Sequence, residues 1–206
     1  MREAIRVLEV LGLIRTQTGS GPQAGAIIVA TPSGGMSALM RLQVAAGGFA
    51  VADVVQTRLV LETSIATALA TGFAAGADTD LVGAAQLLDA MDSPELTAAE
   101  FLALDAQFHL ALAEASGNQV IAAMMAGLRN SIESYVLAAV PNLPCWSGTS
   151  ARLRVEHRGI LAAIASGDAA DAAARVRAHI TRYYAESRLS PTTAAPITTP
   201  SRTPDP

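Results

Sequence analysis

Apolar and polar residues alternate with a helical period along most of the chain after residue 35. Apolar side chains recur every three to four positions, which is the spacing of the buried face of an amphipathic helix. Gly and Pro residues interrupt this pattern, and Thr97-Ala-Ala-Glu100 has the sequence of a capping box that opens a helix. We therefore predict an all-α fold, an antiparallel bundle of six to seven helices, over residues 36–46, 51–75, 79–91, 98–115, 119–140, 149–165 and 169–187.

The first 31 residues have a different pattern. Residues 2–12 carry a helical apolar stripe that ends at Gly12, a residue typical of helix C-termini. Two β-prone runs, residues 13–17 and 26–30, flank a segment rich in Gly, Ser and Pro, which predicts a β-hairpin. The chain thus divides into a helix-and-hairpin fragment, a linker, a helical domain and a Ser/Thr/Pro-rich tail that we expect to be disordered, over residues 1–31, 32–35, 36–188 and 189–206.

The three histidines of the chain, His109, His157 and His179, each lie on the apolar face of a different predicted helix. Asp105 precedes His109 by four residues, which places both side chains on one helical face. All four residues occupy positions where the pattern expects an apolar core residue, and a buried carboxylate without a partner is costly. A divalent metal would satisfy all four side chains, and oxygen and nitrogen ligands without thiolate suit Zn²⁺, Ni²⁺, Mn²⁺ or Fe²⁺. The pattern alone leaves open the alternative that the histidines are hydrogen-bonded core residues that bind nothing.

Composition adds limits on the setting and the partners. The net charge is −4 and all 14 basic residues are Arg, which argues against a globally basic nucleic-acid binder but leaves room for a small DNA-reading patch. Cys145 is the single cysteine, so no internal disulfide can form, which fits a reducing compartment. The first residues lack the pattern of a signal peptide, and the chain has no uncharged run of 18 apolar residues. We therefore expect a cytoplasmic protein without a transmembrane helix.

Three segments have a family-like spacing: Asp105-x-x-Phe-His109-x-x-Leu-x-x-Ala-Ser-Gly-Asn118, His157-x-x-Ile-x-x-Ala-Ile-x-x-Gly-Asp168 with His179 downstream, and Asp53-x-x-x-x-Arg58-x-x-x-Glu62. Together they resemble the FCD effector-binding domain, the C-terminal domain of the FadR subfamily of GntR transcription regulators. The resemblance covers about residues 36–187. It implies an all-helical bundle, a homodimer, a metal bound by Asp105 and the three histidines, and a small carboxylate effector nearby.

Arg58 is a candidate contact for such an effector on physical grounds as well. It lies in line with Val54 and Val55 on the inward side of its helix. Its guanidinium can hold a carboxylate through two parallel hydrogen bonds. The alternative is an internal salt bridge with Glu62 at i, i+4, and one carboxylate does not exhaust the guanidinium, so both can hold.

The N-terminal fragment, residues 1–31, resembles the recognition helix and the wing of the GntR winged helix-turn-helix. A recognition helix places its N-terminal side chains in the major groove, so Arg2 and Arg6 are candidates for DNA contact. The alternative is an ordinary solvated surface helix. The two helices that precede this one in the family are missing, so the chain as given should bind DNA poorly or not at all. From the resemblance we hypothesise that the full protein begins about 50–60 residues upstream, so that the missing part of the winged helix-turn-helix is included.

These observations favour a metabolite-responsive DNA-binding transcription regulator with operator DNA, a small carboxylate metabolite and a second copy of itself as partners. One alternative is a metal-dependent hydrolase, in which a metal with an open position activates water. Against an enzyme, the chain has no His-Glu-x-x-His motif, and Glu156, next to His157, is expected to point about 100° away around the helix. Another alternative is an effector-binding dimer that lacks DNA binding.

Overall fold

The computed structural model describes residues 49–187, the strands β1 (Ile14–Gln17) and β2 (Gly25–Ile28), and a few single positions before residue 49. The two strands pair with each other in antiparallel orientation. Most of the two helices predicted before residue 49, the linker and the tail lie outside the described residues. The predicted domain boundaries therefore stay predictions.

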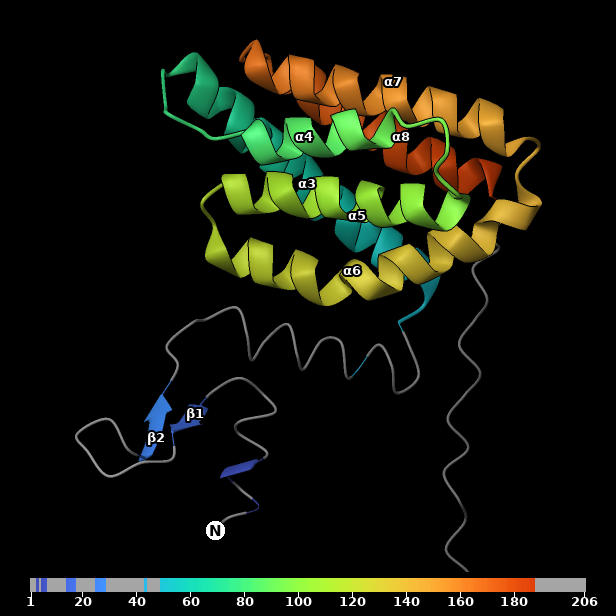
Figure 1. Ribbon diagram of the computed structural model, residues 1–206. Helices are drawn as coiled ribbons and strands as arrows, with labels where there is room; N and C mark the ends of the chain where they lie inside the picture. The colour runs from blue at the N-terminus through green and yellow to red at the C-terminus, as the bar shows by residue number, and fades with distance from the viewer. Residues whose placement is uncertain are drawn as a thin grey trace, which may run out of the picture.

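Residues 49–187 form an all-α domain, as the apolar periodicity predicts. Six α-helices and one 3-10 helix in this range pack side by side in a bundle (Figure 1). α3 is central to the bundle because it contacts α5, α6, α7 and α8. The helices are α3 (Val51–Ala74), α4 (Val82–Met91), α5 (Ala98–Ala115), α6 (Gln119–Ala139), η1 (Val140–Asn142), α7 (Trp146–Ala165) and α8 (Ala169–Glu186).

Side-chain caps fix the starts of three helices where the sequence predicts them. Thr97 Oγ1 accepts a hydrogen bond from the Glu100 N–H, and the Glu100 carboxylate accepts one from the Thr97 N–H, which completes the capping box of α5. Asn118 caps α6 and Asp168 caps α8 in the same way, through their side-chain oxygens. Each such cap stabilises a helix by about 1 kcal/mol. These caps set the ends of the short turns between antiparallel neighbours.

Two helix starts differ from the prediction. α4 begins at Val82 rather than at residue 79, because the Asp80 side chain accepts the Val82 N–H at 2.8 Å and holds a turn there. α7 begins at Trp146 rather than at residue 149. The indole packs edge-on against the Phe101 ring of α5, with ring centroids 5.6 Å apart, and this contact stabilises the first turn of α7.

The described core is mostly apolar, with one cluster of buried ionisable side chains at its centre. The largest fully buried apolar side chains come from α3, α4, α5, α7 and α8 and include Val54, Met91, Phe101, Phe108, Leu153 and Val176. This ionisable cluster comprises Arg58 and Glu62 on α3, Asp105 and His109 on α5, His157 on α7 and His179 on α8, all at most 4% exposed.

The turn between α7 and α8 presses against the end of α3. Gly167 in this turn has φ of 75°, a left-handed conformation that favours glycine. A Cβ added at Gly167 would lie 2.9 Å from Ala74 Cβ and 3.1 Å from Ala74 Cα. The absence of a side chain at residue 167 therefore lets the turn contact the C-terminal residue of the central helix.

We expect Gly167→Ala to destabilise the domain by about 2–4 kcal/mol, because it adds the cost of a left-handed alanine to a clash with the α3 backbone. Gly117→Ala is the matched control. Gly117 has φ of 73°, but a Cβ there meets nothing within 4 Å among the described residues, so this variant should lose only about 1–2 kcal/mol. Denaturant unfolding followed by circular dichroism measures both, and equal losses would show that the contact with Ala74 does not matter.

Candidate metal centre and effector pocket

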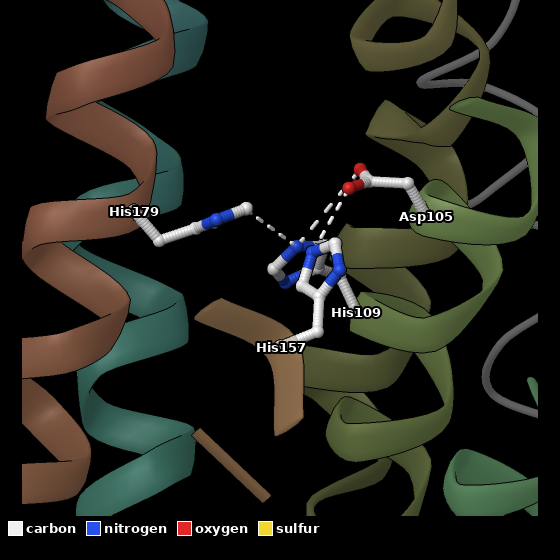
Figure 2. A group of neighbouring side chains, drawn as sticks. All are labelled: Asp105, His109, His157 and His179. Carbon is white, nitrogen blue, oxygen red and sulfur yellow. Dashed lines mark hydrogen bonds and ion pairs between the residues drawn. The ribbon is translucent and has the colours of Figure 1, made fainter. Parts of the chain in front are cut away.

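Asp105, His109, His157 and His179 converge at one place in the core (Figure 2). Each offers one ligand atom, and these atoms all lie within 4.8 Å of one another. The first two residues reach the site from one face of α5, whereas α7 and α8 each contribute one histidine. The sequence prediction that these four side chains share one buried site is confirmed.

The distances between the donor atoms suit a small cation. His109 Nε2 lies 3.3 Å from His179 Nε2 and 4.0 Å from Asp105 Oδ2. His157 Nε2 lies 2.9 Å from Asp105 Oδ1. Ligand atoms held about 2.0–2.1 Å from a tetrahedral ion stand about 3.3 Å apart. The donors therefore have the spacing of a ligand set for one metal ion.

His157 gives the strongest sign that this group binds a ligand. Its side chain is 0% exposed, yet neither ring nitrogen has a hydrogen-bond partner among the described residues. Its Nε2 approaches Asp105 closely but is not aligned for a regular hydrogen bond. Leaving a buried polar group unpaired costs about 1–3 kcal/mol. The ring therefore does not behave as an ordinary hydrogen-bonded core histidine, and a metal ion would supply the missing partner.

The protonation states of the site also suit metal binding. Burial alone would raise the pKa of the Asp105 carboxyl, but the neighbouring His157 lowers this pKa well below its usual range. Burial, and after it the neighbouring His157, lowers the pKa of His179 to about 4. At neutral pH the carboxylate is thus ionised and the His179 imidazole is neutral, which are the forms that coordinate a cation.

Two further carboxylates contact the outer nitrogens of the histidines. His109 Nδ1 lies 2.6 Å from Glu62 Oε2, although the ring N–H is not aligned for a regular hydrogen bond. His179 Nδ1 lies 3.0 Å from Glu156 Oε2. Metal-bound histidines usually donate their second N–H to such a carboxylate, which turns the other nitrogen towards the ion. The arrangement leaves the Nε2 atoms of both histidines facing the centre of the site.

The contact of Glu156 with the site was missed in the sequence, where only its angle of about 100° from His157 around the helix was considered. Glu156 and His157 are consecutive on α7, so their side chains leave the helix in different directions. α8 packs against α7. The Glu156 side chain therefore meets His179 rather than solvent and is 20% exposed. The apolar periodicity of a single helix carries no signal for such a contact, because the contact depends on which helix lies beside it.

Arg58 is buried and only partly paired. Its Nε donates to Glu62 Oε1 at 2.6 Å, which confirms the i, i+4 salt bridge, and its Nη1 donates to the Tyr135 hydroxyl at 3.1 Å. Its Nη2 is buried with no partner in the part of the chain that the structure describes. Burial alone would lower the pKa of Arg58, but Glu62 raises it above its usual value. The guanidinium is therefore charged and keeps a donor for a ligand.

A cavity joins Arg58 to the candidate metal centre. It is small and partly open, with a cavity volume of about 20 Å³, which is close to what one water-sized molecule needs. Both Arg58 and two of the candidate metal ligands line it. The lining includes Arg58, Tyr135, Asp105, His179 and Tyr183. Tyr183 donates its hydroxyl hydrogen to the Val136 carbonyl at 2.8 Å, which fixes that part of the wall. A small anion in this cavity would meet a guanidinium and the metal donors together.

The DNA-contact candidates are not brought to a site by the described residues. Arg6 is helical and exposed, whereas Arg2 lies outside the described part of the chain. None of the described helices is both long and apolar enough to cross a membrane.

Comparisons with known proteins agree with this architecture. Residues 53–182 match the FCD domain family. The fold is similar to that of Streptococcus agalactiae GntR, with a TM-score of 0.58 and 22% sequence identity over 88% of this chain and 78% of that chain. The comparison with curated proteins found no match. Because the matched segment covers more than half of the sequence, the chain belongs to the FCD domain family.

Proposed function

We propose that this protein is a metabolite-responsive DNA-binding transcription regulator whose helical domain binds a divalent metal and a small carboxylate effector. The observation that carries the proposal is that four metal-type donors and a partly unpaired guanidinium meet at one buried cavity. Membership of the FCD domain family supports a sensory role for this cavity.

The proposed metal ligands are Asp105, His109, His157 and His179. Their carboxylate and imidazole donors suit zinc, nickel or manganese. When bound, such an ion supplies a concentrated positive charge and an open coordination position for an oxygen of the effector or of water.

Arg58 is the proposed anchor for the effector carboxylate. A carboxylate accepts charge-assisted hydrogen bonds from a guanidinium, and the unpaired Nη2 supplies the first of these. The cavity also holds negative charge, because Asp105 lines it and Glu62 lies next to Arg58. An anion would be repelled by both carboxylates unless a cation at the metal centre offset them. This charge balance favours an effector that binds beside the metal.

We further propose that the regulator acts as a homodimer in the cytoplasm and contacts operator DNA through Arg2 and Arg6. A recognition helix presents its N-terminal side chains to base edges and phosphates in the major groove. Two copies would read two half-sites. Effector binding would then act by changing the relative placement of the two DNA-binding units, and a coupling of about 1–3 kcal/mol is sufficient for this.

A metal-dependent hydrolase is the competing function. It requires a group free to act as a general base beside the metal-bound water. Among the described residues, the carboxylates nearest the ligand set are Glu62 and Glu156, and each is held by an arginine as well as by a histidine. This arrangement favours a sensor over an enzyme.

Removal of the metal tests the first part of the proposal. We expect a chelator to lower the Tm of the metal-loaded protein by about 5–10 °C, because a ligand at about 100 times its Kd contributes about 2.7 kcal/mol to stability. His157→Ala should abolish this shift and lower metal affinity at least about 100-fold. Ile160→Val, on the same buried face of α7, is the control and should keep the shift. A purified protein without metal and a wild-type Tm insensitive to chelator would show that the site does not exist.

Arg58→Lys tests the anchor while it keeps a positive partner for Glu62. The lysine lacks the planar fork of donors, so binding of carboxylates should weaken about 10–100-fold, whereas metal affinity should change little. Calorimetry with a panel of mono-, di- and tricarboxylates measures this loss. Arg158→Lys, on the exposed face of α7, should leave it unchanged. Equal carboxylate affinity in the Arg58 variant and the wild type would remove Arg58 from the site.

Selection from a pool of random DNA duplexes tests the regulator role with the full-length gene product. We expect enrichment of a two-fold-symmetric sequence, and a loss of about 10-fold in affinity for Arg2→Ala or Arg6→Ala. Metal-loaded protein that enriches no sequence would favour an effector-binding dimer without DNA binding. Turnover of esters or phosphate esters with Zn²⁺ would instead favour the hydrolase.

A further inference from the structure

We propose that Glu62 is a positioning residue that couples occupancy of the metal centre to occupancy of the effector position at Arg58. The inference deepens the proposed function and rests on it. Its basis is that one carboxylate serves both sites. Glu62 Oε1 accepts from Arg58 Nε at 2.6 Å, and Glu62 Oε2 lies 2.6 Å from His109 Nδ1. The Glu62 residue is 3% exposed, so bulk water does not screen either contact.

The charge of this carboxylate is divided between its two partners. Burial alone would raise the pKa of Glu62, but Arg58 and His109 lower it to about 2, so the side chain stays an anion. A ligand carboxylate on the free Nη2 of Arg58 shares the guanidinium with a second anion. The attraction of Arg58 for Glu62 is then weaker, and more of the Glu62 charge acts on His109 Nδ1, which lies 2.6 Å from Oε2.

A stronger acceptor at Nδ1 makes the other nitrogen of a histidine a better metal ligand. An effector carboxylate at Arg58 therefore tightens metal binding through His109. Binding linkage is reciprocal, so metal binding tightens the effector by the same factor. Glu62 and Arg58 lie one turn apart on α3, which keeps the two contacts on one rigid element.

Glu156 provides an internal comparison. It contacts His179 Nδ1 as Glu62 contacts His109 Nδ1, but its guanidinium partners are Arg152 and Arg182. It therefore supports a ligand of the metal centre without a link to Arg58. Loss of either carboxylate should weaken the metal, whereas loss of Glu62 alone should reduce the coupling.

The test measures Zn²⁺ affinity by competition with a chromophoric chelator, with saturating acetate or with chloride at the same ionic strength. In the wild type we expect acetate to tighten Zn²⁺ binding about 5-fold or more. Glu156→Gln should weaken Zn²⁺ about 10-fold and keep the wild-type acetate effect. Glu62→Gln should also weaken Zn²⁺ but reduce the acetate effect to less than half of the wild-type factor. Any coupling through direct contact between acetate and the ion would remain in this variant.

Glu62→Asp is a second variant, which keeps the negative charge but is too short to span both contacts. It should reduce the acetate effect as Glu62→Gln does, and circular dichroism checks that both variants are folded. Wild-type protein that binds both ligands, with an acetate effect unchanged in the folded Glu62 variants, would overturn the coupling alone. Wild-type protein that binds no Zn²⁺ would overturn the proposed function and the coupling with it.

Discussion

The burial of opposite charges at the centre of the helical bundle is the constraint on which the rest of the structure depends. Glu62 and Asp105 are carboxylates within the described core, and each is ionised because a cation or an imidazole lies against it. Removing one member of such a buried pair typically costs about 3–5 kcal/mol. Helices α3, α5, α7 and α8 must therefore hold a common arrangement, since each contributes a side chain to this group.

This constraint explains why sensing residues lie in the core rather than in surface loops. Rigid helices position the donor atoms closely, and a cavity beside them gives a ligand access to the group. α3 has a special place because it carries Arg58, which reaches the cavity, and Glu62, which reaches a histidine. Because both residues lie on one rigid helix, a movement of α3 that displaces Arg58 also displaces Glu62.

Much of the fold and of the site was predictable because its signals are local. The caps at Thr97, Asn118 and Asp168 depend on residues within one turn, and the i, i+4 pair Asp105 and His109 shares a face by helix geometry alone. The convergence of His157 and His179 was predictable because a polar residue on a core-facing stripe must point inwards.

The remaining features depend on which helices are neighbours. The contact of Glu156 with His179, the packing of Trp146 on Phe101 and the cavity beside Arg58 each join different helices. Apolar periodicity reports the angle of a side chain about its own helix axis, and it contains no information on what lies at that angle. These contacts therefore required the three-dimensional arrangement.

The contact of Gly167 with Ala74 has a mechanical consequence for α3. It pins the C-terminal end of the helix, whereas the N-terminal end begins at Ala50 with no side-chain cap from the described residues. At 1.5 Å per residue, Arg58 stands about 24 Å and Val51 about 35 Å from the pinned end. Any tilt of α3 about that pivot displaces Val51 about 1.4 times as far as Arg58, so the helix is a lever that enlarges small movements in the pocket.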